Sequence, residues 1–353
     1  MGNCNEFGLC LAESSWESID LLKKGKQENA LIDYGSLMFI TLQRCKSASE
    51  AIDTMASLMD TYGYASLGGE TFSIVDGKEA WIMDVVGRGA QKVGAVWVAQ
   101  RVPDGSVVAM ANRVKTKVFP KNDPENCRYS ADVVNFAREL GLYQGEDDES
   151  FNFQATYSIA SPASTHFSQS RVLDIYSHLL PNREDFYNTY INYVMSGGVG
   201  LNDTNDDLPL WIQPQQKLTL NDVRDRLSSH FEGTSLEYGP DLASGLFSSP
   251  YRPKPLTWEY QKKTYLNERP VANEFTGTSF ISVIRGWMPL SLQAIVWVGM
   301  DDSSTCPRYP VYASSVAGSQ YYIGKGSQDG VPTTQIMKFH PQKAFWIQNL
   351  VRT

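Results

Sequence analysis

The sequence lacks the short motifs that mark the most common nucleotide, metal and hydrolase sites. It contains no G-x-G-x-x-G at a strand–helix junction, no G-x-x-x-x-G-K-[ST], no H-E-x-x-H and no G-x-S-x-G. Histidine is scarce, and its four copies lie far apart along the chain, at His166, His178, His230 and His340. No local pattern therefore predicts a Ser–His–Asp site, a Cys–His site, a metal site or a bound cofactor.

Long apolar runs and basic clusters are missing as well. The longest apolar stretches, such as Ala294–Met300, have the length of a strand and fall short of the roughly 18–20 residues of a membrane span. The net charge is −8, and no cluster of five or more Lys and Arg residues occurs. Because an acidic chain repels phosphate backbones, the sequence predicts neither nucleic-acid binding nor a membrane span.

The cysteines are few and irregularly spaced. The chain has five, an odd number, and no two are spaced C-x-x-C: Cys4, Cys10, Cys45, Cys127 and Cys306. This pattern disfavours a disulfide framework or a zinc site and favours buried free thiols that behave as small hydrophobic groups. One bridge between two of them stays open if the protein folds in an oxidising compartment.

What is present indicates a folded α+β protein. The 353 residues are 42% hydrophobic and 20% charged, enough to bury one large core or two moderate ones. A helical segment followed by consecutive hairpins predicts antiparallel sheet covered by helices, because a parallel fold would alternate strands with helices.

Strand signals occur in both halves of the chain. A short apolar run over 8–12 predicts a first strand, and Asp76-Gly77 marks a tight hairpin turn. Two hairpins and two later strands are predicted over 72–75 with 80–86, 95–102 with 106–111, 279–284 and 294–299.

Helix signals are equally clear. Ser47 and Glu50 form a capping box that opens a helix, and Gly63 ends it. Apolar periodicity predicts three more helices, over 132–140, 169–180 and from a Thr219 cap to Gly233. An acidic surface loop is expected over 145–150, and a flexible loop rich in Gly, Asn and Asp over 196–207.

Longer strings resemble one peptidase family. Gly2-Asn3-Cys4-Asn5-Glu6, followed by Ala12-Glu13-Ser14-Ser15, resembles the G-N-x-N-E-x-x-L…G-E-T-T segment of the dipeptidase A family. Further anchors in family order include Glu70–Ile74, Trp81–Met83, Gly94–Gly105, Asp123–Cys127, Phe231–Thr234, Ser249–Arg252, Glu268–Pro270 and Ala344–Trp346. A dozen anchors in register cover nearly the whole chain, which makes an unrelated binding fold improbable.

The resemblance implies a fold and a reaction. Members are related to penicillin acylases and bile-salt hydrolases and share a four-layer αββα sandwich of stacked antiparallel sheets, which implies a single domain over residues 1–353. They hydrolyse dipeptides with a free amino end by acyl transfer to a cysteine that processing makes N-terminal. The α-amine of that cysteine is the general base, since its pKa lies near ~8. Dipeptides are thus the expected substrates, and a homo-oligomer is compatible with the family.

The resemblance also implies site residues. Asn112, at the end of a predicted strand, matches a family asparagine whose amide donates to the oxyanion. Arg171 matches an arginine that begins a helix and lies near the thiol, and Ser15 matches a second oxyanion or substrate contact. Glu13 is expected to meet the substrate ammonium. Read without the resemblance, Asn112 ends a hairpin strand and Arg171 lies on a surface.

The nucleophile is the departure from the family pattern. The G-N-x-N-E string starts at residue 2 here, although family members place the nucleophilic cysteine and the first strand before it. The expectation is therefore a domain without its first strand, with an unpaired sheet edge prone to aggregation or partner binding. Two readings follow: a cysteine dipeptidase whose nucleophile lies outside this chain, or a catalytically inactive homologue with a binding or assembly role. The compartment stays open, because a leader would decide it.

Overall fold

The computed structural model describes most of the chain and divides it into two units. Residues 2–23, 30–65, 67–159, 161–196, 208–240, 244–251, 257–266, 268–316, 318–319, 321–322, 327–328, 331–332 and 339–352 are described. The units are Met1–Lys217 and Leu218–Thr353, and each is described by itself below. The flexible loop predicted over 196–207 lies outside the described residues except for Ser196.

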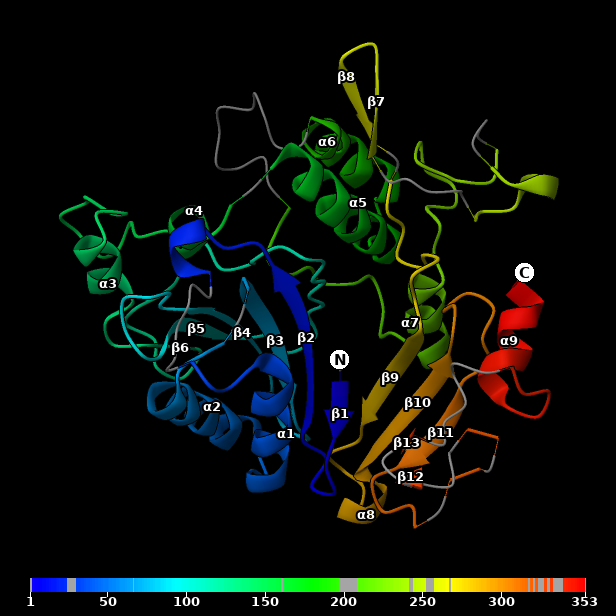
Figure 1. Ribbon diagram of the computed structural model, residues 1–353, viewed down its shortest axis with the longest axis horizontal. Helices are drawn as coiled ribbons and strands as arrows, with labels where there is room; N and C mark the ends of the chain where they lie inside the picture. The colour runs from blue at the N-terminus through cyan, green and yellow to red at the C-terminus, as the bar shows by residue number, and fades with distance from the viewer. Residues whose placement is uncertain are drawn as a thin grey trace. The chain divides into compact units, whose positions relative to one another are not determined.

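A six-stranded antiparallel sheet forms the centre of the first unit (Figure 1). Each strand pairs with the next in sequence, so the sheet is a meander joined by hairpins and longer connections. The strands are β1 (Gly2–Cys4), β2 (Cys10–Trp16), β3 (Gly69–Val75), β4 (Ala80–Gly87), β5 (Ala95–Arg101) and β6 (Cys127–Tyr129). The α+β class expected from the sequence agrees with this mixture of helices and antiparallel sheet.

Helices contribute to the hydrophobic clusters on both faces of this sheet. Helices α1 (Tyr34–Arg44) and α2 (Ala48–Tyr62) supply one cluster together with sheet residues such as Phe72 and Met83. Helices α3 (Val133–Glu139) and α4 (Phe153–Tyr157) supply a second cluster with Val96 and Val98. Because neighbouring residues of a strand point to opposite faces, one strand serves both clusters.

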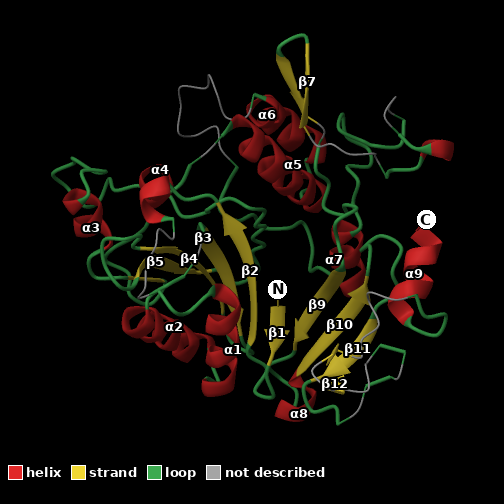
Figure 2. Cartoon of the chain, in the orientation of Figure 1, coloured by secondary structure: helices red, strands yellow, loops and turns green. Residues whose placement is uncertain are grey.

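A helical pair completes the first unit (Figure 2). Helices α5 (Pro162–Leu179) and α6 (Arg183–Met195) pack together. The apolar residues of these two helices form a third cluster with Ala109 and Ala111, which lie just before Asn112. The segment that carries Asn112 is thus packed against this pair. The unit also contains a 3-10 turn, η1, over Asp20–Leu22.

Several predicted elements are confirmed. Helix α2 begins after the Ser47 cap, whose hydroxyl accepts from the Glu50 amide, and it ends at Gly63 with φ of 70°. The β3–β4 hairpin turns at Asp76-Gly77, and the predicted strands over 279–284 and 294–299 lie within β9 and β10. The acidic segment over 145–150 is a loop.

Other predictions are wrong at defined places. Residues 106–111 do not return along β5, because β6 pairs with β5 there, and Val107 instead exchanges two backbone bonds with Ile212. The helix predicted from 169 begins earlier, at Pro162, since Ser161 directly before it forms a capping box with Ser164. Helix α7 ends at Leu227 instead of reaching Gly233.

The second unit contains a three-stranded antiparallel sheet in the order β11-β10-β9. Helix α7 contacts β9, and helix α9 contacts β10. The elements are α7 (Leu220–Leu227), η2 (Leu246–Ser248), β7 (Thr257–Tyr260), β8 (Lys263–Leu266), β9 (Thr278–Ile284), α8 (Leu290–Gln293), β10 (Ala294–Met300), β11 (Tyr309–Tyr312), β12 (Ser327–Gln328), β13 (Val331–Pro332) and α9 (Ala344–Arg352).

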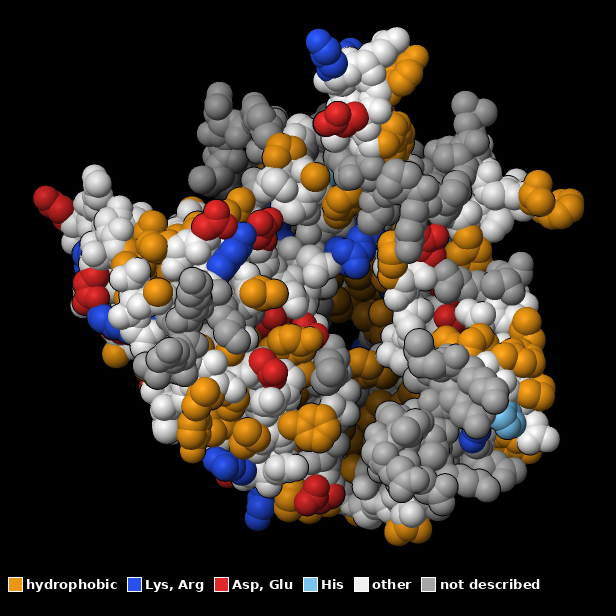
Figure 3. All heavy atoms as spheres, viewed as in Figure 1, with side chains coloured by type: hydrophobic (Ala, Val, Ile, Leu, Met, Phe, Trp, Pro, Cys, Tyr) orange, Lys and Arg blue, Asp and Glu red, His pale blue; other side chains and the backbone are white. Residues whose placement is uncertain are grey.

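The β7–β8 hairpin exposes aromatic rings. Trp258, Tyr260 and Tyr265 are 40%, 60% and 39% exposed, and Trp258 stacks on Tyr265 across the strand pair. Hydrophobic side chains are visible along this hairpin at the top of Figure 3. Among the described helices, none is long and apolar enough to cross a membrane.

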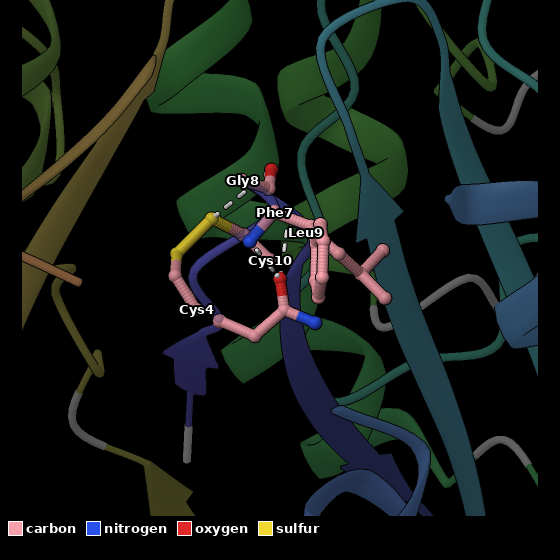
Figure 4. Close-up of a disulfide and its surroundings, with 6 residues drawn as sticks. Cys4, Phe7, Gly8, Leu9 and Cys10 are labelled. Atoms are coloured by element: carbon pink, nitrogen blue, oxygen red, sulfur yellow. Dashed lines mark hydrogen bonds between the residues drawn. A yellow bond between two sulfur atoms is a disulfide. The ribbon is translucent and has the colours of Figure 1, made fainter. Parts of the chain in front are cut away.

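A disulfide ties the first two strands together (Figure 4). Cys4 and Cys10 are direct partners across β1 and β2, and their sulfur atoms are bonded. The prediction of free thiols is wrong for this pair, because the hairpin places their side chains against each other. It is confirmed for Cys45, Cys127 and Cys306, which are buried and free.

The turn between these strands is anchored by Asn5. Its Oδ1 accepts from the amides of Phe7 and Leu9, both at 3.1 Å. Its Nδ2 donates to the carbonyls of Leu42 and Cys45, at 2.9 and 2.8 Å. The disulfide and this side chain together fix the start of β2 beside the end of α1.

Candidate functional site

Asn112 has an unusual backbone conformation that its residue type tolerates. Its φ is 57°, in the left-handed region, where Asn is more frequent than other non-glycine residues. The backbone is held on both sides: its N–H donates to Ser14 Oγ at 2.9 Å, and its carbonyl accepts from Ser168 Oγ at 3.3 Å. The segment therefore bridges strand β2 and helix α5 at this one residue.

The Asn112 side chain is oriented by two further contacts. Its Nδ2 donates to the Ser15 carbonyl at 2.8 Å, and its Oδ1 accepts from Arg171 Nη2 at 2.9 Å. Because an arginine only donates and a carbonyl only accepts, these partners fix which end of the amide is oxygen and which is nitrogen. The second N–H of this amide has no acceptor among the described residues.

Arg171 lies in the middle of α5, so the expectation that it begins a helix is wrong. The helix starts nine residues earlier, at Pro162. Its Nε donates to the Phe167 carbonyl at 2.9 Å, and its Nη2 also lies 3.5 Å from the Ala111 carbonyl. The planar guanidinium thus joins the helix backbone to the Asn112 segment with one rigid group.

Ser15 and Glu13 are on the opposite side of β2 from the Ser14 hydroxyl. Strand alternation places them with their partners Glu70 and Phe72, on the face covered by α1 and α2. Ser15 reaches Asn112 through its backbone carbonyl. Glu13 lies near Tyr34, whose phenol has a pKa raised by burial and then by the charges of Glu13 and Glu70.

Ser14 is the site residue that the sequence analysis missed. Its hydroxyl accepts from the Asn112 backbone, and it lies on the other face of β2 from Leu11. The two-residue period of the strand is the signal that predicts it. Leu11 faces the core, and Ser14 is an odd number of positions away, so its side chain lies on the opposite face.

A small cavity adjoins Asn112. Its volume is about 20 Å³, room for about one water molecule. The lining residues are Trp16, Glu17, Asn112, Arg113, Val114, Ser158, Ile159 and Ser164. A cavity of this size is suited to a solvent molecule beside the amide and is too small to enclose a dipeptide.

Four of the five cysteines, Cys4, Cys10, Cys45 and Cys127, are poorly suited to act as nucleophiles. Burial raises the pKa of Cys45, and it raises the pKa of Cys127 to about 12. Cys4 and Cys10 are bonded to each other. Because the thiolate is the reactive species, buried thiols with raised pKa values are inert at neutral pH.

The described residues include no group of three His, Cys, Asp or Glu side chains able to hold a metal ion. Histidines pair locally instead: His178 Nδ1 lies 3.3 Å from Asp174 Oδ1, and His230 Nδ1 lies 3.2 Å from Glu232 Oε1. His166 Nδ1 is 3.4 Å from the Val194 carbonyl. These contacts belong to separate places in the fold.

Comparison with known proteins identifies the family. The model of peptidase family C69 matches residues 21–353. A probable dipeptidase of Latilactobacillus sakei is 25% identical over 84% of this chain and 52% of its own length. Dipeptidase A of Lactobacillus helveticus is 23% identical over 88% and 54%, and a dipeptidase of Bifidobacterium longum is 28% identical over 57% and 36%. The chain spans about half the length of the first two relatives. Since the family model covers nearly every residue, the chain belongs to peptidase family C69.

Proposed function

We propose that this protein acts in the hydrolysis of dipeptides with a free amino end, by acyl transfer to an N-terminal cysteine. Membership of peptidase family C69 and the dipeptidase names of its relatives support the substrate class. The observation that carries the site is the Asn112 amide, which Arg171 and the Ser15 carbonyl hold in one orientation. In the same proposal, the sheets belong to a four-layer αββα sandwich forming a single domain.

The proposed reaction needs no histidine. The cysteine thiol passes its proton to its own α-amine, and the sulfur attacks the peptide carbonyl carbon to give a tetrahedral oxyanion. The ammonium then protonates the leaving amino acid as the C–N bond breaks, leaving a thioester. Water attacks the thioester with the amine as base, which releases the second amino acid and restores the thiol.

Asn112 is the proposed oxyanion donor. The N–H of its amide that lacks an acceptor among the described residues is suited to the developing negative charge. One such donor is worth roughly 3–4 kcal/mol of transition-state stabilisation. Arg171 donates a hydrogen bond to the amide oxygen of Asn112. This contact polarises the amide N–H groups, because hydrogen bonds in a chain strengthen one another.

Ser15 and Glu13 have lesser parts in the proposal. Ser15 supports the site through its carbonyl, which accepts from Asn112. Glu13 is half-buried on the α1 side of β2 and is the proposed partner of the substrate ammonium. The proposed nucleophile is none of the five cysteines of this chain, because two form a disulfide and three are buried.

The test uses the protein purified from the cells that make it. Mass spectrometry gives the mature amino terminus, and hydrolysis is assayed with dipeptides and with their N-acetylated forms as unreactive controls. Asn112→Ala should lower kcat by about 10²–10³-fold. Asn126→Ala, in a turn where the side chain binds only Asp123 among the described residues, is the matched control and should keep full turnover.

Two outcomes would refute the mechanism. If Asn112→Ala keeps its turnover, the amide is not the oxyanion donor. If Cys45→Ser, Cys127→Ser or Cys306→Ser alone abolishes the activity of a folded protein, one of these thiols is the nucleophile.

The second candidate is a catalytically inactive homologue with a binding or assembly role. The observation behind it is the burial of Cys45, Cys127 and Cys306, which keeps these three thiols from acting as the nucleophile. A mature protein without an N-terminal cysteine and without dipeptide turnover would establish this candidate instead.

A further inference from the structure

Asp84 is a fully buried carboxyl group in the middle of strand β4. Its side chain has 0% exposure, and no cation among the described residues pairs with it. Thr71 Oγ1 donates to one oxygen, and the Thr116 backbone N–H donates to the other at 2.8 Å. Burying a carboxylate without a counter-ion costs free energy unless its oxygens accept hydrogen bonds. Here the two Asp84 oxygens accept from buried donors that would otherwise lack a partner.

Asp84 belongs to a polar row that crosses three strands. Ser14 in β2 pairs with Thr71 in β3, and Thr71 pairs with Asp84 in β4. Directly paired residues lie on the same face of a sheet, so all three side chains point toward the segment that contains Asn112. Ser14 accepts from Asn112 N, and Asp84 accepts from Thr116 N.

The row therefore holds the Asn112 segment at two points four residues apart. Between them the chain leaves the left-handed conformation of Asn112 and reaches the buried Thr116. Gln100 Nε2 donates to Thr116 Oγ1 at 2.9 Å and holds the same end from strand β5. Asn112 is half-buried, whereas Thr116 is fully buried. The contacts that hold Thr116 therefore limit how far Asn112 can move.

We infer that Asp84 is a positioning residue that keeps the Asn112 amide aimed for the reaction. It acts through Thr116, and it touches neither the Asn112 side chain nor Arg171 in the described contacts. The catalytic consequence rests on the proposed function, whereas the structural consequence does not.

The conservative variant makes the inference testable. In Asp84→Asn the amide oxygen accepts from Thr116 N, and the amide nitrogen donates to Thr71 Oγ1, whose hydroxyl is able to accept. Both contacts are kept without the charge. Asp84→Leu keeps the branched shape with a larger volume and removes both acceptors, which leaves the Thr116 N–H buried without a partner.

The first readout needs no turnover. In a nitrogen–proton NMR spectrum of the full chain, the side-chain amide signal of Asn112 is assigned by its loss in Asn112→Ala. Asp84→Leu should shift or broaden this signal, and Asp84→Asn should restore it. Met83→Ala, on the opposite face of the same strand and equally buried, destabilises the core but should leave the Asn112 signal in place.

The second readout is kinetic. In the active protein, Asp84→Leu should lower kcat by about 100-fold with KM little changed, the scale expected for a misplaced catalytic group. Asp84→Asn should recover most of that loss, and Met83→Ala should keep the wild-type kcat in its folded fraction.

The outcomes separate the two proposals. An unchanged Asn112 signal in folded Asp84→Leu overturns the positioning role, whether or not the protein is a dipeptidase. If Asp84→Leu does not fold, Thr71→Val removes the hydroxyl that orients the carboxylate and should shift the signal in the same direction by less. An unchanged signal there overturns the inference as well. A shifted signal in a protein without turnover upholds the positioning role and refutes the proposed function alone.

Discussion

Arg171 donates from Nη2 to Asn112 Oδ1 over 2.9 Å while its Nε binds the Phe167 carbonyl at the same distance. Two nitrogens of one planar group therefore connect a helix backbone to a side-chain amide. The helix thus positions the amide oxygen of Asn112 through Arg171, while the Ser15 carbonyl of β2 accepts from the amide nitrogen.

Replacing this arginine tests the connection. A lysine carries the charge but has one nitrogen, so Arg171→Lys cannot keep both contacts. We expect kcat to fall about tenfold with KM little changed, which corresponds to the loss of one charge-assisted hydrogen bond. Steady-state kinetics on dipeptides measure this. Arg224→Lys, whose exposed side chain pairs with Asp225, is the control and should match the wild type. Equal kcat in both variants would contradict the role.

The left-handed conformation of Asn112 makes a stability prediction. Alanine in this region costs roughly 1–2 kcal/mol, whereas glycine adopts it freely. Asn112→Gly should therefore be more stable than Asn112→Ala by about 1 kcal/mol in urea unfolding. Asn126 does not have a positive φ, so there the alanine variant should equal or exceed the glycine variant. The same order at both positions would contradict the conformational argument.

Glu232 predicts a loss of stability in acid. Burial raises the pKa of this carboxyl, but hydrogen bonds from His230 outweigh burial and bring the pKa down to about 2 from 4.5. A depressed pKa contributes stability that is complete above pH 4.5 and is lost as the pH falls toward about 2. Because the side chain is 58% exposed, solvent limits the contribution to about 1 kcal/mol or less.

The measurement compares the free energy of unfolding in urea at two pH values. At about pH 6 the contribution of Glu232 is complete, and at about pH 3 much of it is lost. Glu232→Gln should reduce the difference between the two values. Glu125→Gln, in an exposed turn, controls for the loss of one negative charge and should keep the wild-type difference. Identical pH dependence in Glu232→Gln and the wild type would show that the His230 contacts contribute nothing.

The disulfide predicts a redox dependence of stability. Cys4 and Cys10 are six residues apart, and closing a loop of this size stabilises by about 2 kcal/mol in the chain-entropy description. Reductant should therefore lower the free energy of unfolding by about that amount. The Cys4→Ser/Cys10→Ser variant should start lower and should not respond to reductant. Alkylation of the unfolded protein should label three thiols before reduction and five after it.

The sequence predicts elements well where the signal is local. The Ser47 cap and the Asp-Gly turn at 76–77 act within a few residues, and α2 and the β3–β4 hairpin are found there. At Ser47 only the cap forms, because Glu50 accepts from the Lys46 amide, whereas Thr219 and Asp222 form a reciprocal capping box at α7. Helix α6 was missed, because its acidic and aromatic composition gives only a weak apolar stripe.

Long-range choices are where the sequence is insufficient. Residues 106–111 look like a returning strand, but Val107 pairs with Ile212, more than a hundred residues away. Arg171 looks like a surface residue until α5 and the Asn112 segment meet. Ser14 and Ser15 are adjacent in sequence, and only the pairing of β2 with β3 decides which hydroxyl lies on which face.

The Cys4–Cys10 bridge bears on which face of β2 carries Ser14 and which carries Ser15. Slipping β2 by a single residue would exchange its faces, turning Ser14 toward Phe72 and withdrawing the acceptor from the Asn112 backbone. The disulfide fixes β1 against β2, and Asn5 holds the turn between them to the end of α1, so the two features together oppose that slip. The first hairpin thus helps to hold the register of β2, on which the position of Ser14 farther along the strand depends.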